Sequence, residues 1–312
     1  MMAVTATEGA GVTASELARV GLVGTGRMGT AMGERILAAG HALTVYNRTP
    51  ERAKALLDAG AARADRLEDL ASTSDVVVTV LTDDAAVDSV YSGLLAGSPE
   101  GTLFVESSTV RASTITRLDP LVRAAGARLV DAPLAGPPPA ARAGQLMVFA
   151  GGDGTDVERA RPVFDTYARR VEHLGPVGAG ITMKLVLMAP MGVFFAALGE
   201  SLAIGAQSGL DRAAMLGVIL DSQVAPPALR DRAPRLLDAE LPANFEVSGV
   251  RKDLQAIVGT GQDVGVPMSV AAAALGLYAG ASAAGFGDAD LVHIVDYVGW
   301  VASRTVPRTP AG

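Results

Sequence analysis

The 312-residue chain contains no cysteine, and this absence limits its chemistry from the start. Disulfides, thiolate catalysis and cysteine-bound zinc are excluded, because each requires a sulfur that the chain lacks. Histidine is scarce as well, and His41, His173 and His293 show no i, i+4 pair that would place two metal ligands on one helix face. We therefore expect no metal site.

Positive charge is also sparse. The chain has 26 Lys and Arg residues against 33 Asp and Glu, a formal net charge of -7, and no block of basic residues. A nucleic-acid surface requires a basic footprint, so we expect no nucleic-acid partner. Hydrophobic residues make up 49% of the chain, enough for a sizeable core, and the length allows two domains. A small-molecule function is favoured.

Long hydrophobic runs and a targeting segment are likewise missing. The apolar run between Lys184 and Glu200 is shorter than the roughly 20 residues of a membrane helix, and Pro190 interrupts it. The opening stretch "MMAVTATEGAGVTASELARV" has neither the basic nor the apolar region of a secretory signal. We expect a core helix for the apolar run, no membrane partner and a cytoplasmic location.

Short β-rich runs alternate with helical patterns from about Arg19 to Leu174, and this alternation is typical of an α/β fold with a parallel sheet covered on both faces. After "GPVGAG" at 175–180, only helical periodicity is found. The sequence predicts a doubly wound dinucleotide-binding domain over 19–179 and an all-helical domain over 180–305. Disordered tails are predicted at 1–18 and 306–312.

The segment "GLVGTGRMG" places Gly24, Gly26 and Gly29 in G-x-G-x-x-G spacing. Such glycines allow a tight turn, close approach of the backbone to a pyrophosphate, and close packing of a helix on the sheet. The motif follows an apolar strand and opens a helix, which is the context of a dinucleotide site. The loop residues predicted to bind the cofactor are Gly24, Thr25, Gly26, Arg27, Met28 and Gly29.

The next strand ends in Asn47, Arg48 and Thr49, and this position selects between the two nicotinamide dinucleotides. A carboxylate here would bond the ribose 2′-hydroxyl and repel a 2′-phosphate, whereas an arginine fork would bind the phosphate. The sequence therefore predicts NADP(H), with NAD(H) as the alternative. Arg48 could instead be an ordinary solvated surface residue.

Several further segments, in this order along the chain, resemble the β-hydroxyacid dehydrogenase family, which includes 3-hydroxyisobutyrate dehydrogenase. The resemblance covers Val20 to Val301 and includes "GLVGTGRMGTAM", "GHALTVYNRT", "LTDDAAV", "ESSTV", "DAPLAG", "GPVGAGITMK", "VRKDLQAI" and "GFGDADLVHIVDYV". It implies a Rossmann-type domain, a long helix joining it to a helical domain like that of 6-phosphogluconate dehydrogenase, and an active site between the two. It also implies homodimers or homotetramers built through the helical part.

The resemblance implies roles for individual residues. Leu81, Thr82 and Thr109 would lie near the cofactor, and Lys252 near its nicotinamide end. Lys184 matches the catalytic lysine of the family: desolvation would lower its pKa, so that it could donate a proton to a carbonyl oxygen or remove one in the reverse reaction. Without the resemblance, Lys184 would be read as a side chain whose stem covers apolar surface while its ammonium reaches water.

Two segments depart from the family pattern. Where relatives that oxidise hydroxy acids carry Ser-Gly-Gly, this chain has Ala135 and Gly136 followed by three prolines, so a hydroxyl and N–H donors for a substrate carboxylate are lost. One turn after the lysine, the usual asparagine is replaced by Leu187 and Met188. We expect a substrate that is bulkier or less acidic than a short hydroxy acid, or else an Arg142 that replaces the lost contacts. Arg142 could also be a plain surface residue.

Two alternative functions remain open at this point. Imine reductases are relatives that prefer NADPH, and the apolar pocket suits them, but they usually carry aspartate or tyrosine where this chain has Lys184. An ammonium would also repel a cationic iminium. The non-enzymatic alternative is an NADP-binding sensor or scaffold, which the lost serine and asparagine favour and the retained lysines oppose. The expected substrate is thus a small carbonyl or imine compound.

Overall fold

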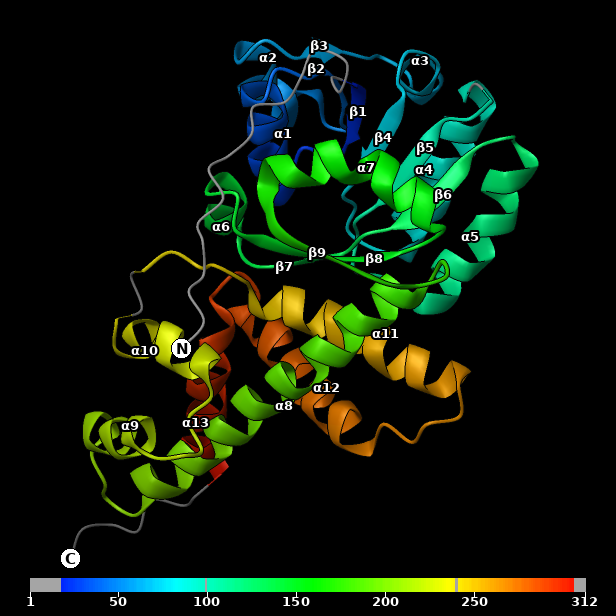
Figure 1. The fold of residues 1–312 in the computed structure, drawn as a ribbon. Helices are drawn as coiled ribbons and strands as arrows, with labels where there is room; N and C mark the ends of the chain where they lie inside the picture. The colour runs from blue at the N-terminus through cyan, green and yellow to red at the C-terminus, as the bar shows by residue number, and fades with distance from the viewer. Residues whose placement is uncertain (1–17, 99, 239–240, 306–312) are drawn as a thin grey trace, which may run out of the picture. The chain divides into compact units, whose positions relative to one another are not determined.

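A computed structural model describes residues 18–98, 100–238 and 241–305. Two compact units divide the chain (Figure 1): unit 1 comprises the residues up to Ser108 together with Ile115–Ile181, and unit 2 comprises Thr109–Thr114 together with the residues from Thr182 onward. The sequence did not predict that Thr109–Thr114 groups with the helical part. Of the predicted tails, only Ala18 lies within the described residues.

Unit 1 is built on a sheet whose order, within the described residues, is β3-β2-β1-β4-β5-β6-β8-β7, with β9 paired to β8. Strands β1 to β6 are parallel along this path, whereas β8 is antiparallel to both β6 and β7. The strands are β1 (Arg19–Val23), β2 (Ala42–Tyr46), β3 (Ala62–Arg63), β4 (Val76–Thr79), β5 (Leu103–Glu106), β6 (Arg128–Asp131), β7 (Leu134–Ala135), β8 (Leu146–Gly151) and β9 (Ala168–Gly175).

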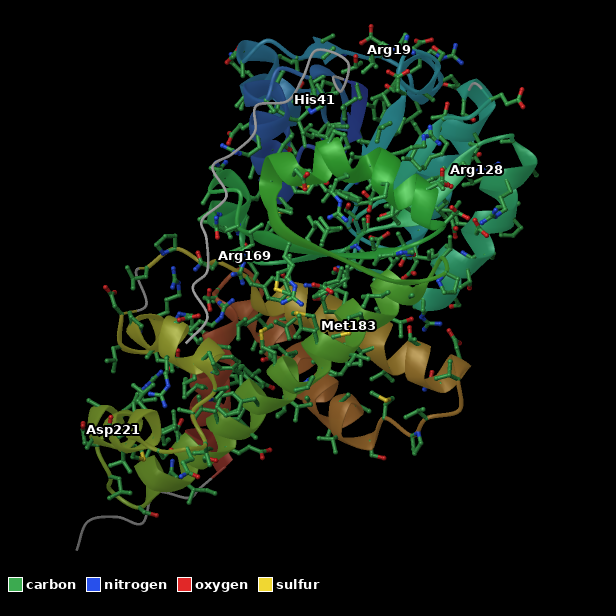
Figure 2. All side chains as sticks on the ribbon, in the orientation of Figure 1. Arg19, His41, Arg128, Arg169, Met183 and Asp221 are labelled. Atoms are coloured by element: carbon green, nitrogen blue, oxygen red, sulfur yellow. The ribbon has the colours of Figure 1, made fainter. Side chains whose placement is uncertain are left out.

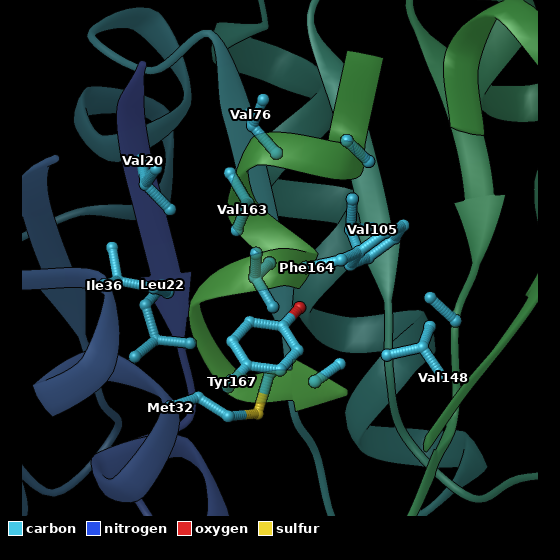
Figure 3. Packing of buried hydrophobic residues seen from close by; sticks show 14 of the residues in the cluster. Val20, Leu22, Met32, Ile36, Val76, Val105, Val148, Val163, Phe164 and Tyr167 are labelled. Carbon is cyan, nitrogen blue, oxygen red and sulfur yellow. The ribbon is translucent and has the colours of Figure 1, made fainter. Parts of the chain in front are cut away.

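Alternate residues of each strand point to opposite faces of this sheet, and both faces are buried. On one face, Val20, Leu22 and Val105 pack against α1 and α7, which contribute Met32 and Phe164 (Figure 3). On the other face, the Phe104 ring lies 5.4 Å from the Tyr91 ring of α4. Burial on both faces explains why the strands are continuous apolar runs. The predicted doubly wound α/β fold is confirmed.

Helices lie between most successive strands of unit 1, with the exception of β6 and β7. They are α1 (Arg27–Ala38), η1 (Pro50–Ala53), α2 (Lys54–Asp58), α3 (Leu67–Ser72), α4 (Asp84–Gly97), α5 (Ala112–Ala124), α6 (Pro138–Arg142) and α7 (Gly154–Tyr167). Because the neighbouring strands of the path from β2 to β6 are parallel, their carboxyl ends meet at one edge of the sheet, where ligands of such folds bind.

Unit 2 is helical, as the sequence predicts. Its elements are α8 (Ala179–Gln207), α9 (Arg212–Asp221), α10 (Pro227–Leu237), α11 (Val247–Asp263), α12 (Ser269–Ala281), the π-helix η2 (Ser282–Phe286), η3 (Leu291–His293) and α13 (Ile294–Thr305). The helix predicted for the apolar run is present as α8, but the expectation that the run is too short was wrong, because α8 continues through Pro190 and has 29 residues. A proline removes one N–H donor, and the rest of a long helix can tolerate that loss.

Two helices of the described part, Ala179–Gln207 and Ser269–Phe286, are long and apolar enough to cross a membrane by length and composition. Core helices of globular proteins pass the same test. The absence of a membrane partner therefore stays a prediction.

Candidate active site

The glycine loop joins β1 to α1 and gives each of its three glycines a distinct role. Gly24 has a φ of 96°, which favours glycine, and a Cβ on it would lie 2.1 Å from the Val80 carbonyl oxygen. A Cβ on Gly29 would lie 1.9 Å from the Gly24 oxygen. A Cβ on Gly26 would have no protein atom within 4 Å. Gly24 and Gly29 thus allow close packing, and Gly26 leaves room for a ligand.

The amino end of α1 fits the pyrophosphate of a dinucleotide. No side chain caps this end, and its first turn, which begins with Arg27 and Met28, contains no acidic residue. Main-chain N–H groups and the positive end of the helix dipole are therefore directed at the open space beside Gly26. The Thr25 hydroxyl in the same loop is buried, and no described residue hydrogen-bonds it. A phosphate oxygen would satisfy such a group.

The end of β2 is held against this loop by Asn47. The Asn47 Oδ1 accepts from the Thr25 N–H at 3.1 Å, and its Nδ2 donates to the Thr49 carbonyl oxygen at 2.8 Å. Arg48 is exposed, and within the described part of the chain its guanidinium makes no hydrogen bond or ion pair. The Thr49 side chain does not cap the helix that follows. The arginine fork and the threonine hydroxyl are thus available to an anion beside the loop.

The chain beyond β4 carries Leu81 and Thr82, which the resemblance assigns to the cofactor. The Leu81 N–H donates to Ser108 Oγ at 2.7 Å, and the Thr82 hydroxyl donates to an Asp83 carboxylate oxygen at 3.1 Å. Glu106, at the end of β5, was missed by the sequence reasoning. It accepts from the N–H of Ser108, whose hydroxyl accepts from the Leu81 N–H. Burial raises the pKa of Glu106 to about 7, although hydrogen bonds from Ser108 and the neighbouring Thr79 act in the opposite direction.

Unit 2 brings the two predicted lysines together. Lys184 lies in the second turn of α8, next to Met183, which is labelled in Figure 2, and it is only 8% exposed. Lys252 of α11 donates from Nζ to the Thr109 carbonyl oxygen at 2.8 Å. Desolvation lowers the pKa of Lys184; the charge of Lys252 acts in the same direction, and the Asp253 carboxylate acts against it.

Asp253 is a member of this lysine cluster that the sequence reasoning missed. Its side chain is 5% exposed, and its Oδ1 lies 3.0 Å from Lys252 Nζ. The available signal was an acidic residue beside Leu254, on the apolar side of an amphipathic helix. The chain has only three lysines, and the third, Lys54, is exposed and paired with Asp58. Two lysines therefore lie beside one aspartate, and because Lys184 and Asp253 are buried, this arrangement indicates chemistry rather than solubility.

A second acidic group that the sequence reasoning missed holds the start of α8. Asp131, at the end of β6, is fully buried and accepts from the N–H groups of Gly178 and Ile181, each at 2.7 Å. Burial raises its pKa to about 6, and these backbone donors limit the rise. Asp131 thus anchors the first turn of the helix that carries Lys184 on its next turn.

The segment after "DAP" is built as the sequence suggests, without a side-chain donor. Ala135 ends β7, and Gly136 has a φ of 130° that favours glycine. Pro137 then precedes α6 without a side-chain cap. On α8, Met188 lies one helical turn after Lys184 and is half-buried. The segment after "DAP" in unit 1 and Met188 in unit 2 each present apolar atoms and no side-chain hydrogen-bond donor.

The contacts of Arg142 do not support a role as a substrate anchor. Its Nε donates to the Glu34 carboxylate of α1 at 2.7 Å, and its Nη2 lies 3.4 Å from the other oxygen of the same group. The guanidinium is thus already paired with a carboxylate on the surface of unit 1. This geometry supports the alternative that Arg142 is a surface residue.

The fold and these groups define the class: an NAD(P)-dependent oxidoreductase with a Rossmann-type domain. Two family models match the chain: the NAD binding domain of 6-phosphogluconate dehydrogenase over residues 19–175, and the NAD-binding domain of NADP-dependent 3-hydroxyisobutyrate dehydrogenase over residues 178–298. The chain belongs to the 3-hydroxyisobutyrate dehydrogenase-like β-hydroxyacid dehydrogenase family.

Individual proteins agree with this assignment. Glyoxylate/succinic semialdehyde reductase 1 of Arabidopsis thaliana is 30% identical over 282 residues, covering 89% of this chain and 98% of that protein. The structure of Mycobacterium tuberculosis 3-hydroxyisobutyrate dehydrogenase with L-serine is similar with a TM-score of 0.82 at 25% identity, covering 90% of this chain and 98% of the other. An imine reductase from Pseudomonas sp. shares the fold with a TM-score of 0.60 at 23% identity, over 90% and 99%. The predicted family and enzyme class are confirmed.

Proposed function

We propose that this enzyme uses NADP(H) to reduce a carbonyl to an alcohol, or to catalyse the reverse reaction, with Lys184 as the proton donor and acceptor. The bound dinucleotide supplies or takes up the hydride at its nicotinamide ring. The observation that carries the proposal is the buried Lys184, whose pKa is lowered by desolvation in a cluster with Lys252 and Asp253.

The desolvated lysine suits proton transfer in both directions. In reduction, a proton leaves Lys184 Nζ and forms an O–H bond with the carbonyl oxygen, and a neutral amine remains. Burial favours that neutral amine over the ammonium, and the Asp253 carboxylate keeps the ammonium accessible. In oxidation, the amine takes the hydroxyl proton. A general acid of this kind acts best when its pKa is close to the working pH.

Selection of NADP(H) is proposed for Arg48 together with Thr49 and Asn47, because the exposed guanidinium has no partner among the described residues. A charge-assisted bond to the 2′-phosphate contributes roughly 1.5–3 kcal/mol, so Arg48→Ala should weaken NADPH binding by about 10- to 100-fold. NADH binding should stay within about twofold, since NADH lacks that phosphate.

Isothermal titration of both cofactors measures this difference, with Arg66→Ala as a control because Arg66 already pairs with Glu68. Equal losses of NADPH and NADH affinity in Arg48→Ala would contradict the assignment.

The substrate is proposed to be bulkier or less acidic than a short hydroxy acid. The plant relative carries glyoxylate and succinic semialdehyde in its name, and both are short acidic aldehydes. In this chain Ala135 offers no hydroxyl and Met188 adds apolar surface. Oxidation of NADPH should therefore be faster with larger neutral aldehydes and ketones than with the two acids, at equal concentrations. Faster turnover of the acids would contradict this proposal.

Imine reduction is a second candidate, favoured by the apolar residues Leu187 and Met188 one turn after the lysine. Adding a preformed cyclic imine to the same panel tests it. The carbonyl proposal predicts faster turnover of the carbonyl compounds, because an ammonium repels a cationic iminium.

A further inference from the structure

A buried carboxylate network lies at the ends of β4 and β5, outside the lysine chemistry. Glu106 is 1% exposed. One carboxylate oxygen accepts from the Thr79 hydroxyl at 2.5 Å, and the other accepts from the Ser108 N–H at 2.7 Å. Thr79 and Glu106 are register partners on adjacent strands, and the Tyr91 hydroxyl of α4 lies 3.2 Å from Thr79 Oγ1. The Thr79 hydroxyl and the Ser108 N–H thus both donate to the Glu106 carboxyl group.

The network reaches the chain that the resemblance assigns to the cofactor. Ser108 follows Glu106 by two residues and accepts the Leu81 N–H on its hydroxyl at 2.7 Å. Hydrogen bonds therefore run from the Glu106 carboxylate through Ser108 to the backbone just beyond β4. Glu106 thereby links the chain after β5 to the chain after β4, at the sheet edge where ligands of such folds bind.

We propose that Glu106 is a positioning residue for the dinucleotide: its ionised carboxylate holds Ser108, and through Ser108 the Leu81 backbone, in the conformation that binds the cofactor. The proposal rests on the proposed cofactor site. An ionised carboxylate can accept from every donor in the network, whereas a protonated one must donate at one oxygen. Protonation therefore forces at least one hydroxyl in the network to turn.

The surroundings of Glu106 allow this change near neutral pH. Desolvation raises the pKa of Glu106 to about 7, and hydrogen bonds from Ser108, Thr79 and Tyr91 limit the rise. The titratable groups on the elements packed against it are Tyr91 from α4 and Asp131, its register partner on β6, while α7 covers the opposite face. Among the described residues, no cation lies within ion-pair distance of the carboxylate.

The test measures the protons released when NADPH binds, by titration calorimetry at pH 7 in two buffers of different ionisation heat. A cofactor that prefers the ionised state lowers the proton affinity of Glu106, because coupling between two sites is reciprocal. Wild type should release more protons than Glu106→Gln. Its NADPH affinity should also rise by about tenfold more than that of the variant between pH 6 and pH 8, a typical coupling. Protons released or taken up by the 2′-phosphate of NADPH are the same for both proteins, so they cancel when wild type is compared with Glu106→Gln.

A matched pair of tyrosine variants separates this role from a packing effect. Tyr91→Phe removes a hydroxyl of the network and should move the midpoint of the affinity change to higher pH, because the anion loses a donor. Tyr167 is also fully buried in unit 1, but its hydroxyl has no partner among the described residues. Tyr167→Phe should therefore leave the midpoint unchanged.

Ser108→Ala gives a second route to the same answer if Glu106→Gln does not fold. It cuts the link to Leu81 while the carboxylate stays, so the additional proton release should disappear in this variant too. Equal proton release and parallel affinity curves in wild type and variants, with NADPH binding intact, would overturn the proposal for Glu106 alone. Failure of wild type to bind NADPH at any pH would overturn it together with the cofactor assignment.

Discussion

Substitution of Gly26 by alanine tests the placement of the cofactor, because the added methyl meets the ligand and not the protein. The Gly26 backbone has φ -72° and ψ -172°, an extended conformation open to any residue, and a Cβ would meet no protein atom within 4 Å. The loss of folding stability should therefore stay near the roughly 1 kcal/mol that separates good and poor helix N-cap residues.

The same methyl would stand where a pyrophosphate must approach the amino end of α1. Carbon and oxygen atoms cannot come much closer than about 3.5 Å, so the phosphate would lose one or two charge-assisted hydrogen bonds. At roughly 1.5–3 kcal/mol each, the affinity for NADPH should fall by about 10-fold to more than 100-fold. Titration calorimetry measures the affinity, and urea unfolding followed by circular dichroism measures the stability.

Gly29→Ala is the matched control, since its Cβ would lie 1.9 Å from the Gly24 backbone oxygen. The backbone of the loop or the helix must shift, so this variant should lose about 3 kcal/mol of stability or more. Full NADPH affinity in a folded Gly26→Ala protein would refute the placement of the pyrophosphate.

Two further predictions concern stability and substrate binding. Glu106 ionises near 4.5 in the unfolded chain and near 7 in the fold, so the fold holds a proton over this range that the unfolded chain has released. Wild-type stability should thus fall by about 3 kcal/mol from pH 4.5 to above pH 7 relative to Glu106→Gln, whereas exposed Glu158→Gln should stay parallel to wild type in urea unfolding. If the stability of Glu106→Gln changed with pH in parallel with that of wild type, the raised pKa of Glu106 would be contradicted. Arg142→Ala should lose at most about 1 kcal/mol of stability, because its pair with Glu34 is exposed. Its turnover of acidic aldehydes should equal that of wild type, and a selective loss on acids would restore Arg142 as a substrate anchor.

The sequence was most informative where a signal is local. Most strands of unit 1 were visible as short apolar runs, because both faces of a largely parallel sheet are buried. Strand β9 was missed because its sequence, "ARRVEHLG", is largely polar and exposed, and β3 and β7 have only two residues each. The glycine loop was readable for the same reason, since its glycines, strand and helix are contiguous.

Contacts between distant residues could not be predicted in this way. Glu106 meets Thr79 across 27 positions, and Asp131 meets the start of α8 across 47 and 50. The sequence also could not show that Arg142 pairs with a carboxylate, because its partner Glu34 lies 108 positions earlier in the chain. The resemblance supplied Lys184 and Lys252, but only the fold showed that Asp253 shares their buried cluster.

The most direct test of the account is a comparison of Lys184→Ala with wild type in single-turnover reduction and in NADPH binding. Lys54→Ala is the control, because this lysine is exposed and paired on the surface. Loss of a general acid typically lowers the rate by about 100- to 10,000-fold, and the account predicts a loss in this range with NADPH affinity within about twofold of wild type. Turnover by Lys184→Ala at the wild-type rate would contradict the central claim that this buried amine transfers the proton.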